Sequence, residues 1–204
     1  MNHWAFDHLG LIYQVYGLAF FTLGVVAWLL PRQDAQLRIA PHLWLLAWFG
    51  FLHGVLEFIE WEQLSRPDSV LASLSPLLLT VSYVPLLEVG RRLFALAGIR
   101  LSGAMVHGVC AAGVVALLAT APSFATLAAA ARIFIGVPGA LMTAWALLRL
   151  RHPDTSANTN SRPLARWLAL LATAFLGYGL LTPFLSPSAA PLVAWLPTTS
   201  DFLA

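Results

Sequence analysis

The sequence predicts an all-α fold, a polytopic membrane bundle of six membrane-spanning helices. Of its 204 residues, 59% are hydrophobic and only 10% are charged, which is too little charge to cover a water-soluble globule of this size. The apolar residues form six runs, each near the ~20 residues that a helix needs to cross the hydrocarbon core of a bilayer. Short segments rich in Pro, Asn, Asp or Ser separate the runs, as is typical of loops. The first partner that we expect is therefore the lipid bilayer.

The six expected spans follow one another along the chain with short connections. They cover residues 8–30, 41–64, 71–94, 101–120, 124–150 and 163–185. The segment 151–162 is the most hydrophilic connection, and its Pro, Asp, Thr, Ser and Asn residues indicate a loop. After the sixth span, residues 186–204 contain three prolines, so we expect an irregular or re-entrant stretch there.

The distribution of arginine predicts that the amino terminus lies outside the cell membrane. Short loops that are rich in arginine stay on the cytoplasmic side. The arginines near the ends of the first, third and fifth spans are Arg32, Arg38, Arg91, Arg92, Arg100, Arg149, Arg151 and Arg162, whereas the opposite connections contain only Arg66. A chain of six spans then ends outside as well. Because residues 194–204 resemble the approach to a further helix, we expect the natural protein to continue through a seventh span into the cytoplasm.

The second span contains the most informative residues, because ionisable side chains interrupt an otherwise apolar helix. The polar or small residues of its central part are Gly50, His53, Glu57 and Glu60. Their spacings of three, four and three place them on one helical face. Ionisable groups at bilayer depth are costly and usually point into the protein, where they mark functional sites. We expect Glu60, with Glu62, to emerge at the membrane interface and His53 and Glu57 to lie deeper.

Polar residues of four other spans are expected at the depth of Glu57, counting ~1.5 Å per helical residue from the outer interface. They are Tyr13, Gln14 and Tyr16 in the first span, Tyr83 in the third, Arg132 in the fifth and Tyr178 in the sixth. We predict a ligand-binding pocket in which Glu57 and Arg132 are an ion pair or oppositely charged anchors. Its residues are Tyr13, Gln14, His53, Glu57, Tyr83, Arg132 and Tyr178. The alternative is a buried structural pair, with the tyrosines as interface anchors.

Two residue pairs raise the question of a metal or a haem. His107 and Cys110 are three residues apart, and imidazole and thiolate suit a soft ion such as Cu(I). His53 with Glu57 could also bind a metal, although the zinc-protease pattern His-Glu-x-x-His is absent. His53 and His107 each precede a glycine, which would let a haem b with two histidine ligands approach closely. In each case a packed, hydrogen-bonded histidine is the simpler interpretation, and the sequence assigns no cofactor.

Other residues within the spans predict structural roles. Glu88 lies three and four residues before Arg91 and Arg92, so we expect local ion pairs near the interface, with coupling to an output domain as the alternative. Glycines let membrane helices approach closely, and prolines kink or end them. The residues concerned are Gly17, Gly24, Gly177 and Gly179 for packing, and Pro85, Pro138 and Pro183 for kinks or ends.

Parts of the chain resemble the amino-terminal multi-helix membrane sensor regions of bacterial histidine kinases and diguanylate cyclases. The similar segments are residues 16–24, 46–61, 86–93 and 195–198, and the distinctive motif within them is His53-Gly-x-x-Glu57. The resemblance implies that residues 1–204 are one transmembrane sensor-type domain in a bacterial inner membrane. It also implies a cytoplasmic kinase or cyclase output domain downstream, which this chain does not contain, and a homodimer formed through such output domains.

The expected function is a sensory input module in signal transduction, for example of a two-component system. A small molecule or cofactor in the polar pocket would bias the helices, and the output domain, not this chain, would be the enzyme. The alternative is a membrane enzyme or transporter that uses His53 and Glu57 for proton or metal chemistry. A retinal Schiff base is excluded because the chain has no lysine. Nucleic acid is not an expected partner, since the net charge is only +2 and the arginines are dispersed.

Overall fold

The computed structural model describes residues 9–31, 38–150 and 161–183. Throughout these residues the regular elements are helices, and six of the helices are long and apolar enough to cross a membrane. Those six cover Leu9–Leu29, Ala40–Ser65, Ser69–Leu96, Gly103–Thr120, Phe124–Leu150 and Pro163–Leu181. The structure confirms the predicted all-α architecture with six helices of membrane-spanning length. The hydrophilic connection and the proline-containing segment 186–204 lie largely or wholly outside the described residues.

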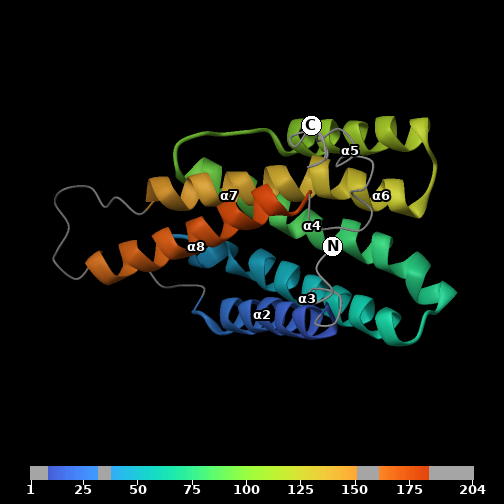
Figure 1. Cartoon of the computed structure of the whole chain (residues 1–204). Coiled ribbons are helices and arrows are strands. Elements are labelled where there is room, and N and C mark those ends of the chain that lie inside the picture. Colours follow the sequence, from blue (N-terminus) through green and yellow to red (C-terminus); the bar gives the residue numbers. More distant parts are fainter. Residues whose placement is uncertain (1–8, 32–37, 151–160, 184–204) are drawn as a thin grey trace, which may run out of the picture.

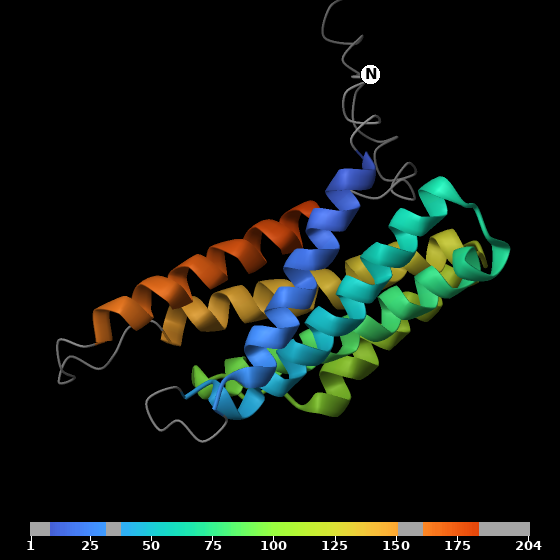
Figure 2. The same ribbon diagram turned by 90° about the horizontal axis from the view of Figure 1, so that it is seen from below.

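The helices lie side by side, with α4 between α3 and α7 (Figures 1 and 2). The elements in chain order are α2 (Leu9–Leu29), the 3₁₀ turn η1 (Ala40–His42), α3 (Leu43–Ser65), α4 (Ser69–Leu96), α5 (Gly103–Thr120), α6 (Phe124–Ala131), the π-helical segment η2 (Arg132–Gly136), α7 (Val137–Leu150) and α8 (Ser161–Leu181). Helix α4 packs against α3, α6 and α7, whereas α2 packs chiefly against α3 and α8 against α7. In Figure 1, α2 and α5 therefore lie at opposite edges of the bundle.

Local capping explains where several helices begin and end. Asp68 precedes α4, and its carboxylate accepts the backbone N–H groups of Val70 and Leu71 at 2.7 and 3.1 Å. Ser123 caps α6 in the same way, accepting the N–H of Thr126 at 3.1 Å. Beyond the end of α4, Gly98 has a φ of 96°, a left-handed conformation that glycine adopts without steric cost.

Glycines bring α2 and α3 into direct backbone contact. A Cβ atom on Gly50 would lie 2.6 Å from both the nitrogen of Gly24 and the carbonyl oxygen of Phe20, and one on Gly54 would lie 3.0 Å from the oxygen of Gly17. No larger side chain fits at Gly50 unless the helices separate. The predicted close packing through Gly17 and Gly24 is confirmed, and it holds the polar face of α3 beside α2.

The glycine prediction for the last helix is only half right. A Cβ atom on Gly179 would lie 3.1 Å from that of Ala140 in α7, which is close packing, whereas Gly177 has no neighbour within 4 Å of such an atom. The two glycines are two residues apart, so they point in different directions from α8. Gly179 faces α7 and Gly177 does not.

The prolines affect the three spans differently. Pro138 follows η2, where the N–H of Val137 bonds to the carbonyl of Arg132, five residues earlier. Because proline lacks an N–H and collides with the carbonyl four residues before it, it disturbs the regular α-helical ladder at this point. The predicted distortion at Pro138 is therefore present. Pro85 lies inside α4, which continues as a helix on both sides of it, and Pro183 follows the end of α8.

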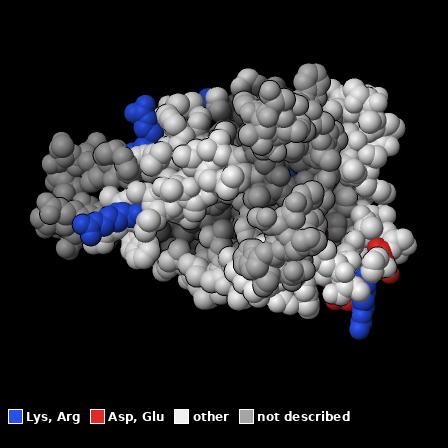
Figure 3. All heavy atoms as spheres, in the orientation of Figure 1, with Lys and Arg blue, Asp and Glu red and all other residues white. Residues whose placement is uncertain are grey.

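The surface and core have the distribution expected of helices in lipid. Side chains such as Phe49, Leu86 and Leu147 are almost completely buried, whereas Val15 and Val109 are 60% and 68% exposed. Figure 3 shows a face with few charged groups between its two ends, and its acidic groups gather at the end where α3 leads into α4. The described helices are thus suited to contact with lipid along their length.

Candidate functional site

Polar side chains from five elements surround a cavity of about 280 Å³. It lies in the half of the bundle nearer to the turn between α3 and α4. Its polar or aromatic lining residues are Tyr13 and Tyr16 from α2, His53, Glu57 and Glu60 from α3, Tyr83 from α4, Arg132 from η2, Tyr178 from α8, and Thr182 directly after α8. Leucine and isoleucine side chains complete the wall. We call this space the polar cavity.

Six of the seven residues predicted for the pocket line the polar cavity: Tyr13, His53, Glu57, Tyr83, Arg132 and Tyr178. In particular, Glu57 and Arg132 face the same space, although they are far apart in the sequence. Gln14 is the exception and does not line the cavity. Adjacent residues of a helix differ in direction by about 100°, so Gln14 cannot share the face of its neighbour Tyr13.

Hydrogen bonds hold the ring of His53 in one orientation. His53 is only 3% exposed, and its Nδ1 lies 3.0 Å from the hydroxyl oxygen of Ser82 in α4. That hydroxyl donates its own proton to the carbonyl oxygen of Leu79 at 2.7 Å, so its oxygen is left to accept the Nδ1–H of His53. A neutral imidazole has one donor and one acceptor nitrogen. Nε2 is therefore the nitrogen that His53 presents to the polar cavity as an acceptor.

The Nε2 side of His53 connects three helices. It lies 3.0 Å from the hydroxyl of Tyr178 in α8 and 3.5 Å from Oε1 of Glu57. The Tyr178 hydroxyl in turn forms a hydrogen bond of 3.1 Å with the hydroxyl of Tyr83 in α4. A chain of hydrogen bonds thus runs from Ser82 through His53 and Tyr178 to Tyr83. Any movement of α8 relative to α3 and α4 must change these contacts.

Aromatic rings enclose His53 on its other sides. The ring centres of Phe20 and Phe49 lie 4.5 and 5.2 Å from that of His53. Phe49 is fully buried, and Phe20 also packs edge-on against Tyr178 at 5.5 Å. Within such an apolar enclosure a hydrogen bond is electrostatically stronger than in water, and a polar group without a partner is more costly.

The charged lining of the polar cavity comes from α3 and η2. Glu57 is 7% exposed, and Glu60 is one helical turn further along the same face. Arg132 is the first residue of the π-helical segment, and such segments occur frequently at functional sites. The ring of Tyr83 fits against this segment because Gly136 has no side chain; a Cβ atom there would lie 2.9 Å from the ring.

Sequence reasoning missed four residues of this region: Tyr16, Glu60, Ser82 and Thr182. Glu60 was expected at the membrane interface, but it lines the polar cavity, as its place on the stripe of His53 and Glu57 could have indicated. Tyr16 follows Tyr13 by three residues, so helical periodicity places both on one face. For Ser82 and Thr182 the sequence offers no signal, because their roles depend on which helices are neighbours.

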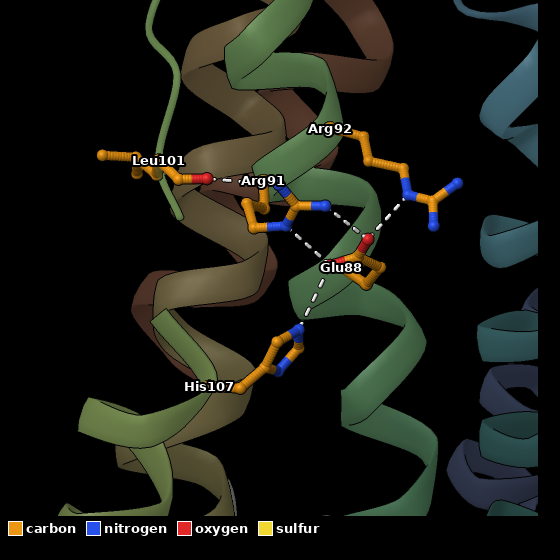
Figure 4. Close-up of polar contacts among 5 residues, drawn as sticks. All are labelled: Glu88, Arg91, Arg92, Leu101 and His107. Atoms are coloured by element: carbon orange, nitrogen blue, oxygen red, sulfur yellow. Dashed lines mark hydrogen bonds and ion pairs between the residues drawn. The ribbon is translucent and has the colours of Figure 1, made fainter. Parts of the chain in front are cut away.

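A second charged cluster surrounds Glu88 near the other end of α4 (Figure 4). The carboxylate of Glu88 accepts hydrogen bonds from Arg91 at 2.7 and 2.8 Å and from Arg92 at 2.6 Å, which confirms the predicted local pairing. It also accepts one from Nε2 of His107 in α5 at 3.1 Å, which the sequence did not predict. Arg91 further donates to the carbonyl oxygen of Leu101 at 3.2 Å. We call these residues the Glu88 cluster.

The two histidines considered for metal or haem binding belong to separate clusters. His53 has partners at both ring nitrogens in the polar cavity, whereas Nε2 of His107 is bound by Glu88. Cys110 is buried one turn after His107. Over the described residues, no three or more His, Cys, Asp or Glu side chains gather in a way that could hold a metal ion.

Comparisons with protein-family models, with curated proteins and with solved structures give no match for this chain. The resemblance to kinase and cyclase sensor regions therefore stays a prediction. The fold and the site define a class in structural terms: a multi-pass membrane-type helix bundle with an internal polar cavity.

Proposed function

We propose that this chain is the membrane-embedded sensory input module of a bacterial signalling protein, and that the polar cavity binds its small-molecule ligand. The observation that supports this is the convergence of ionisable and phenolic side chains from five elements on one cavity of about 280 Å³. Ionisable residues at membrane depth usually serve a site. A concave space with a few convergent polar groups is the usual form of a ligand site.

The size of the polar cavity favours ligand binding over a purely structural ion pair. Ligand pockets commonly measure ~300–1,000 Å³, so a volume of about 280 Å³ suits a small molecule or one ring of a larger one. A structural role for the charged groups does not by itself account for an enclosed volume of this size beside them.

The relay that we propose uses the hydrogen-bonded chain from Ser82 to Tyr83. A ligand shifts a conformational equilibrium only if it binds one arrangement of the helices better than another. A ligand that competes for the hydroxyls of Tyr83 and Tyr178 would change how α8 sits against α3 and α4. The cytoplasmic output domain, the inner-membrane location and the dimer formed through output domains belong to this proposal and rest on the resemblance and on the arginine distribution.

The test is to recover the bound molecule. The full chain is purified from membranes in mild detergent, and the small molecules that remain bound are extracted and quantified by mass spectrometry. We expect a compound that is retained by the wild type and reduced at least tenfold by Glu57→Gln, with Glu62→Gln as the matched control because Glu62 does not line the polar cavity. Equal retention by both variants would contradict the proposal.

A second candidate function is proton transfer through the membrane. It is favoured by the 3.5 Å distance between Nε2 of His53 and Oε1 of Glu57, which brings two proton-exchanging groups together inside the bundle. Vesicles that contain the purified chain and an internal pH-sensitive dye test it. Proton uptake that needs no further domain, and that His53→Gln abolishes, would favour this function over the sensory one.

A further inference from the structure

A second, apolar cavity of about 510 Å³ lies between α2 and α8. Its walls include Ala19, Phe20 and Leu23 from α2 and Leu171, Ala174 and Leu181 from α8. Close backbone packing joins α2 to α3 and α8 to α7, but among the described elements it does not join α2 to α8. The space between these two helices is therefore a groove, which we call the α2–α8 groove.

The α2–α8 groove adjoins the polar cavity. Tyr16 and Tyr178 line both spaces. Tyr178 bonds to His53 through its hydroxyl on the cavity side, and Phe20 of the groove packs against both Tyr178 and His53. A single molecule could thus have one part among the polar groups and another part along the groove.

The two spaces differ in chemistry. The groove is lined almost entirely by apolar side chains and runs from Tyr16 to Leu23 along α2, about 10 Å at ~1.5 Å per residue. The cavity offers phenolic hydroxyls, an imidazole, two carboxylates and one guanidinium. A ligand that satisfies both must be amphiphilic, with a polar head and a hydrocarbon tail.

The charges around the cavity restrict the polar head. Glu57 and Glu60 place two carboxyl groups beside the single guanidinium of Arg132. Sites that bind phosphate present several cationic or N–H donors, so this lining does not favour a phosphate head. A neutral ring with carbonyl oxygens suits the site better, because tyrosine hydroxyls can donate to those oxygens and the tyrosine rings can pack against the flat face of the head.

We propose that the ligand is an isoprenoid quinone, with its ring in the polar cavity and its tail in the α2–α8 groove. This inference rests on the proposed function of the cavity and names the class of its ligand. The tail would occupy the lipid-side gap between α2 and α8, and the ring would reach the hydroxyls of Tyr83 and Tyr178. Binding of the ring alone and binding of the tail can therefore be separated by substitutions in different places.

The experiment compares two probes on the full chain in detergent: 2,3-dimethoxy-5-methyl-1,4-benzoquinone with and without a decyl tail. Binding is followed by quenching of tryptophan fluorescence, and each probe is compared between variants in the same detergent, so that partition into micelles cancels. Ala174→Trp fills the groove. We expect this variant to weaken binding of the tailed probe at least tenfold, about 1.4 kcal/mol. Binding of the tail-less ring should change less than twofold.

Matched variants complete the design. Ala111→Trp places the same side chain at an exposed position of α5 that lines neither space. It should leave the binding of both probes unchanged. Tyr83→Phe removes one hydroxyl from the polar cavity and should weaken both probes. Ala19→Trp fills the groove from the α2 side and replaces Ala174→Trp if that variant does not fold.

The outcomes separate the two proposals. If the groove variants leave the tailed probe unchanged while Tyr83→Phe still weakens the ring, the groove assignment is wrong and the cavity retains its proposed function. If Tyr83→Phe changes the binding of neither probe, the quinone is not the ligand of the polar cavity.

A second measurement extracts the molecules bound to the wild type with solvent. If it recovers a phospholipid instead of a quinone, and that lipid is lost in Ala174→Trp, the groove binds a lipid tail and the quinone assignment is overturned. If, in addition, Glu57→Gln retains every extracted compound as the wild type does, the proposed function of the cavity fails as well.

Discussion

The Glu88 cluster and the polar cavity contain similar side chains and use them differently. Around Glu88, two arginines and a histidine are in direct hydrogen-bond contact with one carboxylate at 2.6–3.1 Å. Around Glu57, a histidine, a second glutamate, an arginine and four tyrosines surround about 280 Å³. In the Glu88 cluster the charged groups are one another's hydrogen-bond partners, and the bond to His107 links α4 to α5. The arrangement around Glu57 encloses a volume that a small molecule can occupy, which is why we propose ligand binding for the cavity and a structural role for the cluster.

The largest expected effect comes from separating the walls of the polar cavity without changing any polar residue. In Gly50→Val the new side chain meets the backbone of α2, which cannot move aside locally. Overpacking typically costs about 1–3 kcal/mol, and the backbone contacts at Gly50 put this variant at the upper end of that range. We expect most of the folded protein to be lost in a thermal unfolding measurement by circular dichroism. Gly177→Val is the control, because no neighbour lies within 4 Å of its position, and equal loss in both variants would contradict the role given to α2–α3 packing.

The next effect tests the structural role of the Glu88 cluster. Glu88→Ala leaves Arg91, Arg92 and His107 without their shared acceptor, and we expect a loss of about 1–2 kcal/mol in unfolding free energy with ligand retention unchanged. Glu62→Ala removes an acidic residue that is 4.0 Å from Arg66 at an exposed site, and it should cost about 0–1 kcal/mol. A loss of bound ligand in Glu88→Ala would contradict the purely structural role given to the Glu88 cluster.

Glu57→Gln is expected to weaken ligand retention and to leave stability almost unchanged, which is the reverse of Glu88→Ala. The amide keeps the shape of the carboxylate but removes its charge, so the cavity loses an anchor and the fold keeps its packing. We expect at least tenfold weaker ligand retention and a change in unfolding free energy below about 1 kcal/mol. A structural pair predicts instead that Glu57→Gln and Arg132→Ala both lose folded protein, which the same unfolding measurement would reveal.

The smallest effect on ligand binding concerns the orientation of His53. Ser82→Ala removes the acceptor of Nδ1–H, at a cost of about 1–3 kcal/mol if the buried donor stays unpaired, and it frees the ring to change its tautomer. We expect ligand affinity to fall severalfold, and ¹⁵N chemical shifts of the labelled imidazole should show the change of tautomer. Ser75→Ala in the same helix is the control, since Ser75 contacts none of these groups. Unchanged imidazole shifts in Ser82→Ala would contradict the tautomer assignment.

The sequence was sufficient for the features that depend on a single helix. The six spans follow from apolar runs, and the shared face of His53 and Glu57 follows from helical periodicity. Depth counting also placed Tyr83, Arg132 and Tyr178 at the level of Glu57. It failed for Gln14, because depth alone does not say in which direction a side chain points.

Contacts between helices could not be predicted in the same way. The bonds of His53 to Ser82 and Tyr178, and of His107 to Glu88, require knowing that α3, α4 and α8 meet and that α5 lies beside α4. A single sequence contains periodicity within each helix, but no statement of which helices are neighbours. The apolar groove between α2 and α8 depends on how the helices are arranged, so no pattern in the sequence predicts it.

The π-helical segment at Arg132 lies between the two halves of the fifth span. A π turn accommodates one residue more than an α-helical turn, so removing one residue from η2 and restoring a regular α-helix there would leave α6 and α7 facing as they do now. Only the residues of η2, Arg132 among them, would change direction. The extra residue therefore shapes one wall of the polar cavity without turning the rest of the fifth span.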